Sequence, residues 1–235
     1  MMISGLQKMT LLDFPGKVAC TVFLQGCNYR CPFCHNSELL GGGGQEFMSE
    51  EEFLAFLKKR VGLLDGVAVS GGEPTLYKGL EDLLVQIKAL GYAVKLDTNG
   101  SRPQVLKALV EKGLVDYVAM DVKNGPDAYG QTVGIAKLDL AATEESLRFL
   151  IGGKVDYELR TTLVEPLHTE GSVAQMGQWL AALVPGKKPK QLFLQRFVDR
   201  DTVLFSGLCA PDADTVSHYG ELLAPYVEKI TLRGD

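Results

Sequence analysis

Residues 18–34 read VACTVFLQGCNYRCPFC, an apolar run that passes directly into a polar, cysteine-rich stretch. The β-branched and apolar residues at 18–24 predict a buried strand. The same order, an apolar run followed by a polar motif, recurs at SGGEP (70–74), LDTNG (96–100) and MDVK (120–123). Sites in parallel α/β folds form at the carboxyl ends of the strands. The repeated order therefore predicts a parallel sheet with one shared functional site at one edge.

Strand-like runs alternate with helical patterns along the rest of the chain. We expect strands over 18–24, 66–70, 93–97, 114–120, 155–164, 191–197 and 229–233. We expect helices over 49–62, 77–90, 102–112, 143–151, 171–183 and 212–226. Such alternation implies parallel strands with right-handed crossovers. Six βα units are fewer than the eight of a closed barrel, so we predict a partial, open (β/α)6 TIM-like barrel that forms a single domain over residues 1–235. A doubly wound open sheet is the alternative.

Local signals place several helix ends. Ser49 with Glu52 three residues later is a capping-box pattern, which predicts a helix start. Gly91 is expected to stop the preceding helix, and Thr143 to cap the helix that follows it. The Gly-, Asn- and Asp-rich residues 124–134 predict a loop.

Composition excludes several classes of protein. The 235 residues are 46% hydrophobic and 23% charged, which suits an ordinary globular core. A net charge of −5 argues against a nucleic-acid partner. No apolar run approaches the roughly 18 residues that a membrane span needs, and the first residues lack the plan of a signal peptide. We therefore expect no membrane partner and a cytoplasmic location.

Three of the five cysteines crowd into one motif. Three residues separate Cys27 from Cys31, and two separate Cys31 from Cys34. A structural zinc site prefers four ligands in pairs, so zinc is an open alternative with an incomplete ligand set. A disulfide would leave one thiol over. An iron–sulfur cluster takes thiolates at such short spacings, and three ligands would leave one iron open for chemistry. Cys20 and Cys209 are expected to be small buried residues.

These motifs together resemble a known superfamily. C-x3-C-x2-C after the first strand, followed by GGEP after the second, resembles the radical S-adenosylmethionine (SAM) superfamily. The match extends to the activating enzymes of glycyl-radical enzymes, above all those of anaerobic ribonucleoside-triphosphate reductase, with the pyruvate formate-lyase activators as near relatives. It covers nearly the whole chain, and the stretches that carry it are DFPGK (13–17), FLQGC (23–27), CHN (34–36), LDTNG and MDVK.

The resemblance implies two cofactors. Cys27, Cys31 and Cys34 would hold a 4Fe–4S cluster whose fourth iron is chelated by SAM. Reduction of the cluster would cleave SAM to methionine and a 5′-deoxyadenosyl radical. The residues that the resemblance places around the cluster and SAM are Phe33, His35, Gly71, Gly72, Glu73, Pro74, Asp97, Thr98, Asn99, Asp121, Lys123, Arg160 and Gln195.

The implied roles of these residues differ. Glu73 would accept a hydrogen bond from the ammonium group of SAM, and Lys123 would face its carboxylate. Asp97 and Asp121 would share a monovalent cation, as the pyruvate formate-lyase activators suggest. Gln195 departs from the histidine that those activators carry at the aligned position, so a direct contact between Gln195 and SAM stays open.

Ordinary structural explanations exist for several of these residues. GGEP suits a plain strand-to-helix turn, and His35 a solvated loop. Asp97 suits a helix cap, and Lys123 an exposed surface position. These alternatives are open at the level of the sequence.

The resemblance also implies partners. A glycyl-radical enzyme would present a glycine-bearing loop as the protein substrate, and an electron donor such as flavodoxin or ferredoxin would reduce the cluster. Two other functions compete with this one. The first is a radical SAM enzyme that acts on a small molecule, similar to 7-carboxy-7-deazaguanine synthase. The second is a non-enzymatic module that binds zinc or a cluster. The DFPGK, FLQGC and CHN stretches favour the activating enzyme.

Overall fold

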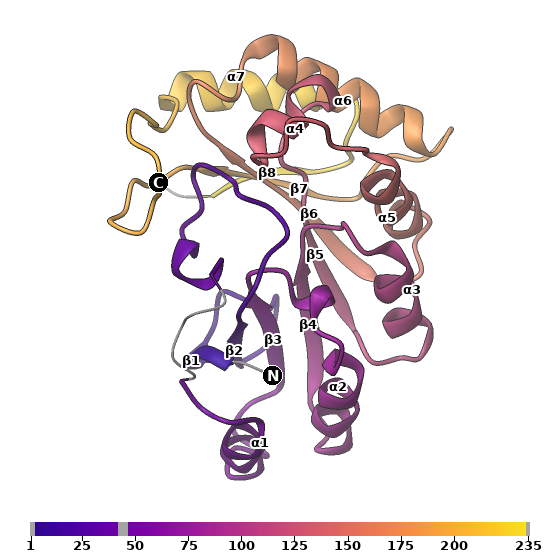
Figure 1. Ribbon diagram of the computed structural model, residues 1–235. Helices are drawn as coiled ribbons and strands as arrows, with labels where there is room; N and C mark the ends of the chain where they lie inside the picture. Colours follow the sequence, from indigo (N-terminus) through magenta and orange to yellow (C-terminus); the bar gives the residue numbers. More distant parts are fainter. Residues whose placement is uncertain (1–2, 42–46, 234–235) are drawn as a thin grey trace. The chain divides into compact units, whose positions relative to one another are not determined.

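The computed structural model describes residues 3–41 and 47–233 (Figure 1). Its eight strands follow one another in chain order, β1-β2-β3-β4-β5-β6-β7-β8, in an open sheet. The strands are β1 Ile3–Thr10, β2 Ala19–Leu24, β3 Gly66–Gly71, β4 Ala93–Thr98, β5 Tyr117–Asp121, β6 Asp156–Leu163, β7 Leu192–Arg196 and β8 Ile230–Arg233. Strands β2, β3 and β4 pair in parallel, as do β6, β7 and β8. This mostly parallel α/β sheet confirms the predicted fold class.

Within the described residues, seven α-helices and two short 3-10 helices connect the strands. They are α1 Glu50–Lys58, α2 Leu80–Ala89, α3 Pro103–Glu111, α4 Pro126–Thr132, α5 Ala141–Ile151, α6 Glu170–Leu183, α7 Ala213–Leu223, η1 Ser37–Leu39 and η2 Pro74–Leu76. The chain divides into two compact units. Unit 1 contains residues 1–28 and 38–119, and unit 2 contains residues 29–37 and 120–235. The single domain expected from the sequence stays a prediction, and each unit is described by itself.

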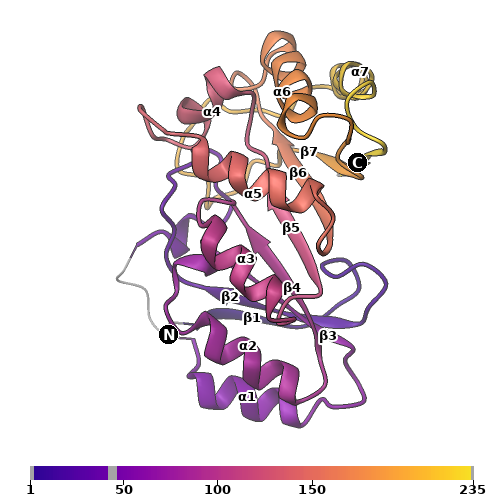
Figure 2. The same ribbon diagram turned by 90° about the vertical axis from the view of Figure 1, so that its right-hand side faces the viewer.

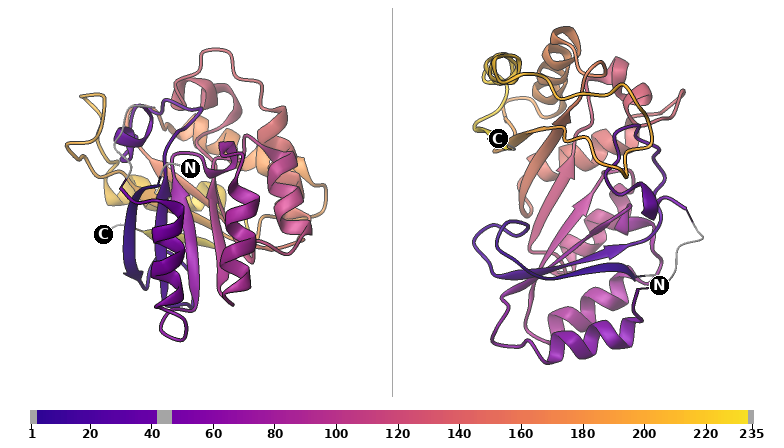
Figure 3. Two further views of the ribbon diagram at one scale, coloured as in Figure 1. Left: turned by 60° about the horizontal axis from the view of Figure 1, so that its bottom comes forward. Right: turned by 90° about the vertical axis from the view of Figure 1, so that its left-hand side faces the viewer.

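In unit 1, α1 and α2 lie side by side against the strands (Figure 2, and the left view of Figure 3). The capping box of α1 is present, because Ser49 and Glu52 each accept a hydrogen bond from the other's backbone N–H. Helix α2 ends before Gly91, whose φ of +87° only glycine adopts readily. Both helix ends therefore lie where local chemistry predicts them.

In unit 2, α6 packs against α4, α5 and α7 (Figure 2). Two predictions are wrong here. Residues 124–134 contain α4 rather than only a loop, because Pro126 sets the first helical turn and Tyr129 is buried. Thr143 does not cap α5, which starts two residues earlier, where Asp139 accepts a hydrogen bond from the N–H of Ala141 at 2.9 Å.

The sequence analysis did not predict strand β1. It pairs antiparallel with β2, and its central residues are exposed or half-buried. An edge strand of this kind needs no continuous apolar run, so its sequence carries little signal. The turn that follows it contains Phe14, whose buried ring packs on Tyr117 at a centroid distance of 6.1 Å. Thr10 pairs with Ala19 and Ala19 with Gly66, so this turn lies at the amino ends of the parallel strands.

The strand registers align the carboxyl ends that carry the motifs. In unit 1, Leu24 pairs with Gly71, and Val69 pairs with Leu96. The segments after β2, β3 and β4 therefore leave the sheet at one edge, as predicted for this unit. In unit 2, Thr162 pairs with Gln195 near the ends of β6 and β7.

Candidate active site

The two glycines of the GGEP motif allow a close backbone contact inside unit 1. The N–H of Gly72 donates to the carbonyl of Leu24 at 2.9 Å, and the N–H of Glu73 donates to the carbonyl of Gly26 at 2.7 Å. A Cβ atom on Gly71 would lie 2.2 Å from the Leu24 oxygen, and one on Gly72 would lie 2.1 Å from the Gly26 oxygen. The glycines are therefore required by the segment that leads into the cysteine motif.

Glu73 is a buried hub between the GGEP and LDTNG motifs. Its Oε1 accepts hydrogen bonds from the N–H and hydroxyl of Thr75 and from the Thr98 hydroxyl, the last at 2.8 Å. Its Oε2 accepts the N–H of Asn99 at 2.6 Å. Burial raises the pKa of the Glu73 carboxyl above its ordinary value, and these donors act in the opposite direction. The carboxylate also caps η2, which begins at Pro74. The structural explanation of GGEP as a turn thus holds, while the contact with SAM stays a prediction.

Asn99 links this hub to Cys27. Its Nδ2 donates to Oδ1 of Asn28 at 2.9 Å and lies 3.9 Å from the sulfur of Cys27. Asn28 in turn donates to the hydroxyl of Ser101 at 3.0 Å. The structure thus brings together Cys27, Glu73, Thr98 and Asn99, which the sequence had placed in one site.

Asp97 lies in β4 and does not cap a helix, so that alternative is wrong. Its Oδ2 accepts a hydrogen bond from the Ser70 hydroxyl at 2.9 Å, and its Oδ1 forms an ion pair with Lys95. The Lys95 side chain is only 2% exposed. Sequence reasoning missed Lys95, although one charged residue within the apolar run AVKL is itself a signal, because buried lysines are rare without a partner.

Unit 2 holds a second charged cluster. The two oxygens of Asp121 pair with Arg160 Nε at 2.9 Å and with Lys123 Nζ at 2.8 Å. Burial opposes ionisation of Asp121, but Arg160 and then Lys123 outweigh it and lower its pKa to about 2. Burial also disfavours the charged form of Lys123, yet Asp121 and then Cys31 keep its pKa above the ordinary value. Lys123 is therefore not a simple surface lysine.

We expect Asp121→Asn to lower the free energy of unfolding by about 2 kcal/mol at pH 7. The folded pKa of about 2 lies below the ordinary 3.8, so this contribution is present above pH 4 and is lost as the pH falls toward 2. Urea unfolding of both proteins at pH 7 and at pH 3 checks this. Asp156→Asn, at an exposed position, is the matched control and should change little. An equal loss of stability at both pH values would contradict the ionic origin.

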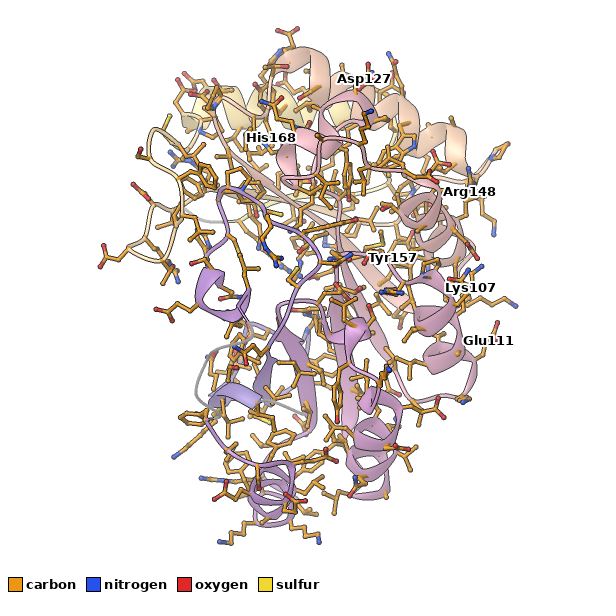
Figure 4. The ribbon with its side chains drawn as sticks, viewed as in Figure 1. Lys107, Glu111, Asp127, Arg148, Tyr157 and His168 are labelled. Atoms are coloured by element: carbon orange, nitrogen blue, oxygen red, sulfur yellow. The ribbon has the colours of Figure 1, made fainter. Side chains whose placement is uncertain are left out.

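A buried histidine supports the Lys123 backbone. Nδ1 of His168 accepts the N–H of Val164 at 3.1 Å, so Nε2 carries the proton and donates to the carbonyl of Lys123 at 2.8 Å. Burial lowers the pKa of His168, which favours this neutral form. Figure 4 labels His168 in the segment that leads into α6. The sequence analysis missed this residue, because a lone histidine has no motif around it.

The residues that flank Cys31 and Cys34 are packed within unit 2. The N–H of Cys34 donates to the carbonyl of Cys31 at 3.1 Å, which closes a turn. Phe33 is buried, with Lys123 Nζ at 5.9 Å from its ring centroid. His35 stacks on Phe197 at 5.6 Å and hydrogen-bonds through Nε2 to the carbonyl of Val198 at 2.7 Å.

Burial is the main cause that lowers the pKa of His35, which is half-buried in a turn, so the alternative of a loop position in contact with solvent stays open. Gln195 is half-buried in β7, where it also pairs with Arg233 of β8.

The cysteines form no disulfide, which removes that alternative. Cys20 is buried as predicted, but Cys209 is exposed, so the prediction of a buried Cys209 is wrong. Cys209 lies in the irregular segment before α7, where an exposed position needs no apolar partner. Within the described residues, no three His, Cys, Asp or Glu side chains form a preformed metal-binding group. Cys27 belongs to unit 1, and Cys31 and Cys34 belong to unit 2.

Comparison with known families matches residues 21–171 to the radical SAM superfamily. This match spans more than half of the sequence, so the chain belongs to the radical SAM superfamily. It is therefore an enzyme of this superfamily, and membership implies a 4Fe–4S cluster and SAM as cofactors. This excludes the non-enzymatic binding module. Three thiols in one short motif suit an iron–sulfur cluster chemically.

Among the described residues, no helix is long and apolar enough to cross a bilayer.

Three relatives illustrate the range of similar proteins. A Methanocaldococcus jannaschii protein, provisionally named a glycyl-radical enzyme activating enzyme, is 29% identical over 99% of this chain and 95% of its own. A 7-carboxy-7-deazaguanine synthase of Koribacter versatilis is 33% identical, and the match covers 66% of each chain. A pyruvate formate-lyase-activating enzyme of Clostridium pasteurianum is 33% identical, with 53% of each chain covered.

Solved structures support the fold. A domain of a pyruvate formate-lyase-activating enzyme from Bacteroides vulgatus is similar with a TM-score of 0.58 at 19% identity, over 72% of this chain and 99% of that domain. SuiB of Streptococcus suis, solved with its precursor peptide SuiA, has a TM-score of 0.69 at 11% identity, over 91% of this chain and 48% of SuiB. At these identities the likeness concerns the fold alone.

Proposed function

We propose that the chain is a glycyl-radical enzyme activating enzyme, which cleaves SAM reductively and generates a glycyl radical on a partner protein. The observation that carries this proposal is the extent of the match to the Methanocaldococcus jannaschii relative, which covers 99% of this chain. The DFPGK, FLQGC and CHN stretches support the same assignment and favour anaerobic ribonucleoside-triphosphate reductase as the partner. A flavodoxin or ferredoxin is the proposed electron donor.

In this proposal Cys27, Cys31 and Cys34 would hold the cluster, which when reduced would supply the electron for cleavage of a C–S bond of SAM. The chain's own residues orient the cofactors. The Asn99 amide lies against the Cys27 sulfur, and the Glu73 hub holds Asn99 in place.

The charges in unit 2 suit the carboxylate of SAM. Lys123 and Arg160 both pair with Asp121, so two cationic side chains lie at one carboxylate and can also attract the carboxylate of a ligand. Phe33 and the stacked pair of His35 and Phe197 supply flat apolar surface beside these charges, which favours an aromatic base. We propose that these residues bind SAM. Gln195 is a further candidate for contact with SAM.

The alternative function is a radical SAM enzyme that acts on a small molecule. The Koribacter versatilis relative supports it, because the match reaches 33% identity over 66% of each chain. That match leaves about a third of this chain uncovered, whereas the Methanocaldococcus jannaschii match covers nearly all of it. We therefore rank the activating enzyme first.

Electron paramagnetic resonance separates the two functions. Anaerobic, cluster-loaded and dithionite-reduced protein is incubated with SAM and with purified anaerobic ribonucleoside-triphosphate reductase. The expected result is the doublet signal of a glycyl radical on the reductase, and none when its target glycine is replaced by alanine. Turnover of a deazapurine precursor without any partner protein would instead establish the alternative. Replacing dithionite with flavodoxin or ferredoxin then tests the electron donor.

A further inference from the structure

The sequence resemblance implies a monovalent cation at Asp97 and Asp121, but the side chains within each unit do not fit one. Asp97 carries one negative charge and already pairs with the ammonium of Lys95. Asp121 already pairs with both Lys123 and Arg160. The negative charge of each carboxylate is therefore already balanced by a cationic side chain of the protein. A metal cation brought to either one would meet positive charge at hydrogen-bond distance and would be repelled.

The backbone of β4 places Lys95 beside Asp97. Residues two apart in a strand share a face, so Lys95 and Asp97 point to the same side, while Val94 and Leu96 point to the other. On the neighbouring strand, Ala68 pairs with Lys95 in register. A small residue there leaves room for a long side chain to lie along the sheet toward Asp97.

The burial of Lys95 shows that this ion pair is a fixed part of the fold. The Lys95 side chain is 2% exposed and that of Asp97 is 16% exposed. A buried ammonium is tolerated only with a counter-ion and hydrogen bonds. The second oxygen of Asp97 is held by the hydroxyl of Ser70, so the carboxylate is fixed on both sides.

We propose that Lys95 is the resident counter-ion of Asp97 and occupies the place of a monovalent metal ion, so that this enzyme needs no Na⁺ or K⁺ at Asp97. Lys95 is then a positioning residue, which acts by orienting Asp97. The inference deepens the proposed function, in which Asp97 lines the SAM pocket. It concerns charges within unit 1, however, and its main test does not depend on SAM cleavage.

Thermal unfolding of the full chain in choline chloride, NaCl and KCl at equal ionic strength tests the proposal. The wild-type protein is expected to melt at the same temperature in all three salts. Lys95→Ala should melt roughly 5–15 °C lower in choline chloride, because it leaves a half-buried carboxylate without its cation. NaCl or KCl should restore part of this loss with a saturable dependence, as the metal ion enters the vacated position.

Lys112→Ala is the matched control. Lys112 pairs with Glu81 at 2.6 Å, but the two side chains are 52% and 46% exposed. Exposed ion pairs contribute little to stability, so this variant should melt close to the wild type in every salt. The control separates loss of a buried counter-ion from loss of any lysine.

Several results would overturn the proposal. One is a saturable stabilisation of the wild type by Na⁺ or K⁺ over choline. Others are a Lys95→Ala variant as stable as the wild type, or one that neither metal ion rescues.

If Lys95→Ala does not fold, the double variant Lys95→Ala with Asp97→Asn decides, because it removes both charges. The double variant should fold and should be more stable than the single variant. Its melting temperature should be the same in all three salts. A different result on any of these points would contradict an electrostatic role of Lys95.

SAM binding gives an independent readout. Equilibrium binding of SAM to the cluster-loaded wild type should agree within about twofold between choline chloride and KCl, since no metal ion is needed. A much tighter binding in KCl would count against the inference. Absence of SAM binding in both salts would instead speak against the proposed function, and the unfolding experiments would still decide the role of Lys95.

Discussion

Cys31→Ala is expected to abolish SAM cleavage while the protein remains folded. The motif supplies only three cysteine ligands, so removal of one thiolate leaves too few ligands for a stable 4Fe–4S cluster. Cys31 is small and buried, and the alanine side chain fits in its place. Anaerobic iron and sulfide analysis, visible absorption and 5′-deoxyadenosine formation measure the loss, and circular dichroism measures the fold.

Cys209→Ala is the control for this experiment. Cys209 is exposed and lies outside the motif, so its replacement should retain iron content and SAM cleavage at the wild-type level. Cleavage of SAM by Cys31→Ala at a rate near that of the wild type would refute the assignment of Cys31 as a ligand. Iron loss in both variants alike would show that the effect comes from handling of the protein.

Gly72→Ala should reduce SAM cleavage by at least about 100-fold, since displacements of the order of 1 Å near a reacting centre have effects of this size. The added methyl group would lie 2.1 Å from the carbonyl oxygen of Gly26, which is backbone and cannot rotate away. The segment from Leu24 to Asn28 must shift, and Cys27 moves with it. Stopped-flow or quenched assays of 5′-deoxyadenosine formation under single-turnover conditions measure the change.

Gly41→Ala is the matched glycine control. A Cβ atom at Gly41 meets no other atom within 4 Å, and its φ lies outside the left-handed region. This variant should cleave SAM at the wild-type rate. If Gly72→Ala were as active as Gly41→Ala, the close contact between the GGEP motif and the segment after β2 would not position Cys27.

The sequence predicted the parallel strands well, because each is an apolar run that is bounded by a turn or a polar motif. It could not predict β1, since an edge strand with exposed central residues lacks such a run. It also missed α4, whose Gly, Asn and Asp residues are typical of loops. There the rigid φ of Pro126 and the burial of Tyr129 outweigh the weak helix propensity of the segment.

The site residues were predictable where a motif carried them and not where tertiary contacts did. Glu73 was correctly singled out, yet its two oxygens turn out to be engaged by Thr75, Thr98 and Asn99, which no spacing rule could indicate. Lys95 and His168 act on neighbouring residues through burial, and burial depends on the assembled fold. Residues of this kind are visible only once the packing is known.

Strand β2 separates two stretches that suggested the same partner. DFPGK lies at the amino end of β2 and FLQGC at its carboxyl end, and a strand of six residues spans roughly 17 Å. A short peptide that reaches Cys27 can contact only the second stretch. Recognition through Asp13 to Lys17 would require a second area of contact at the far end of the strand, which a folded partner can reach and an isolated glycine-bearing peptide cannot.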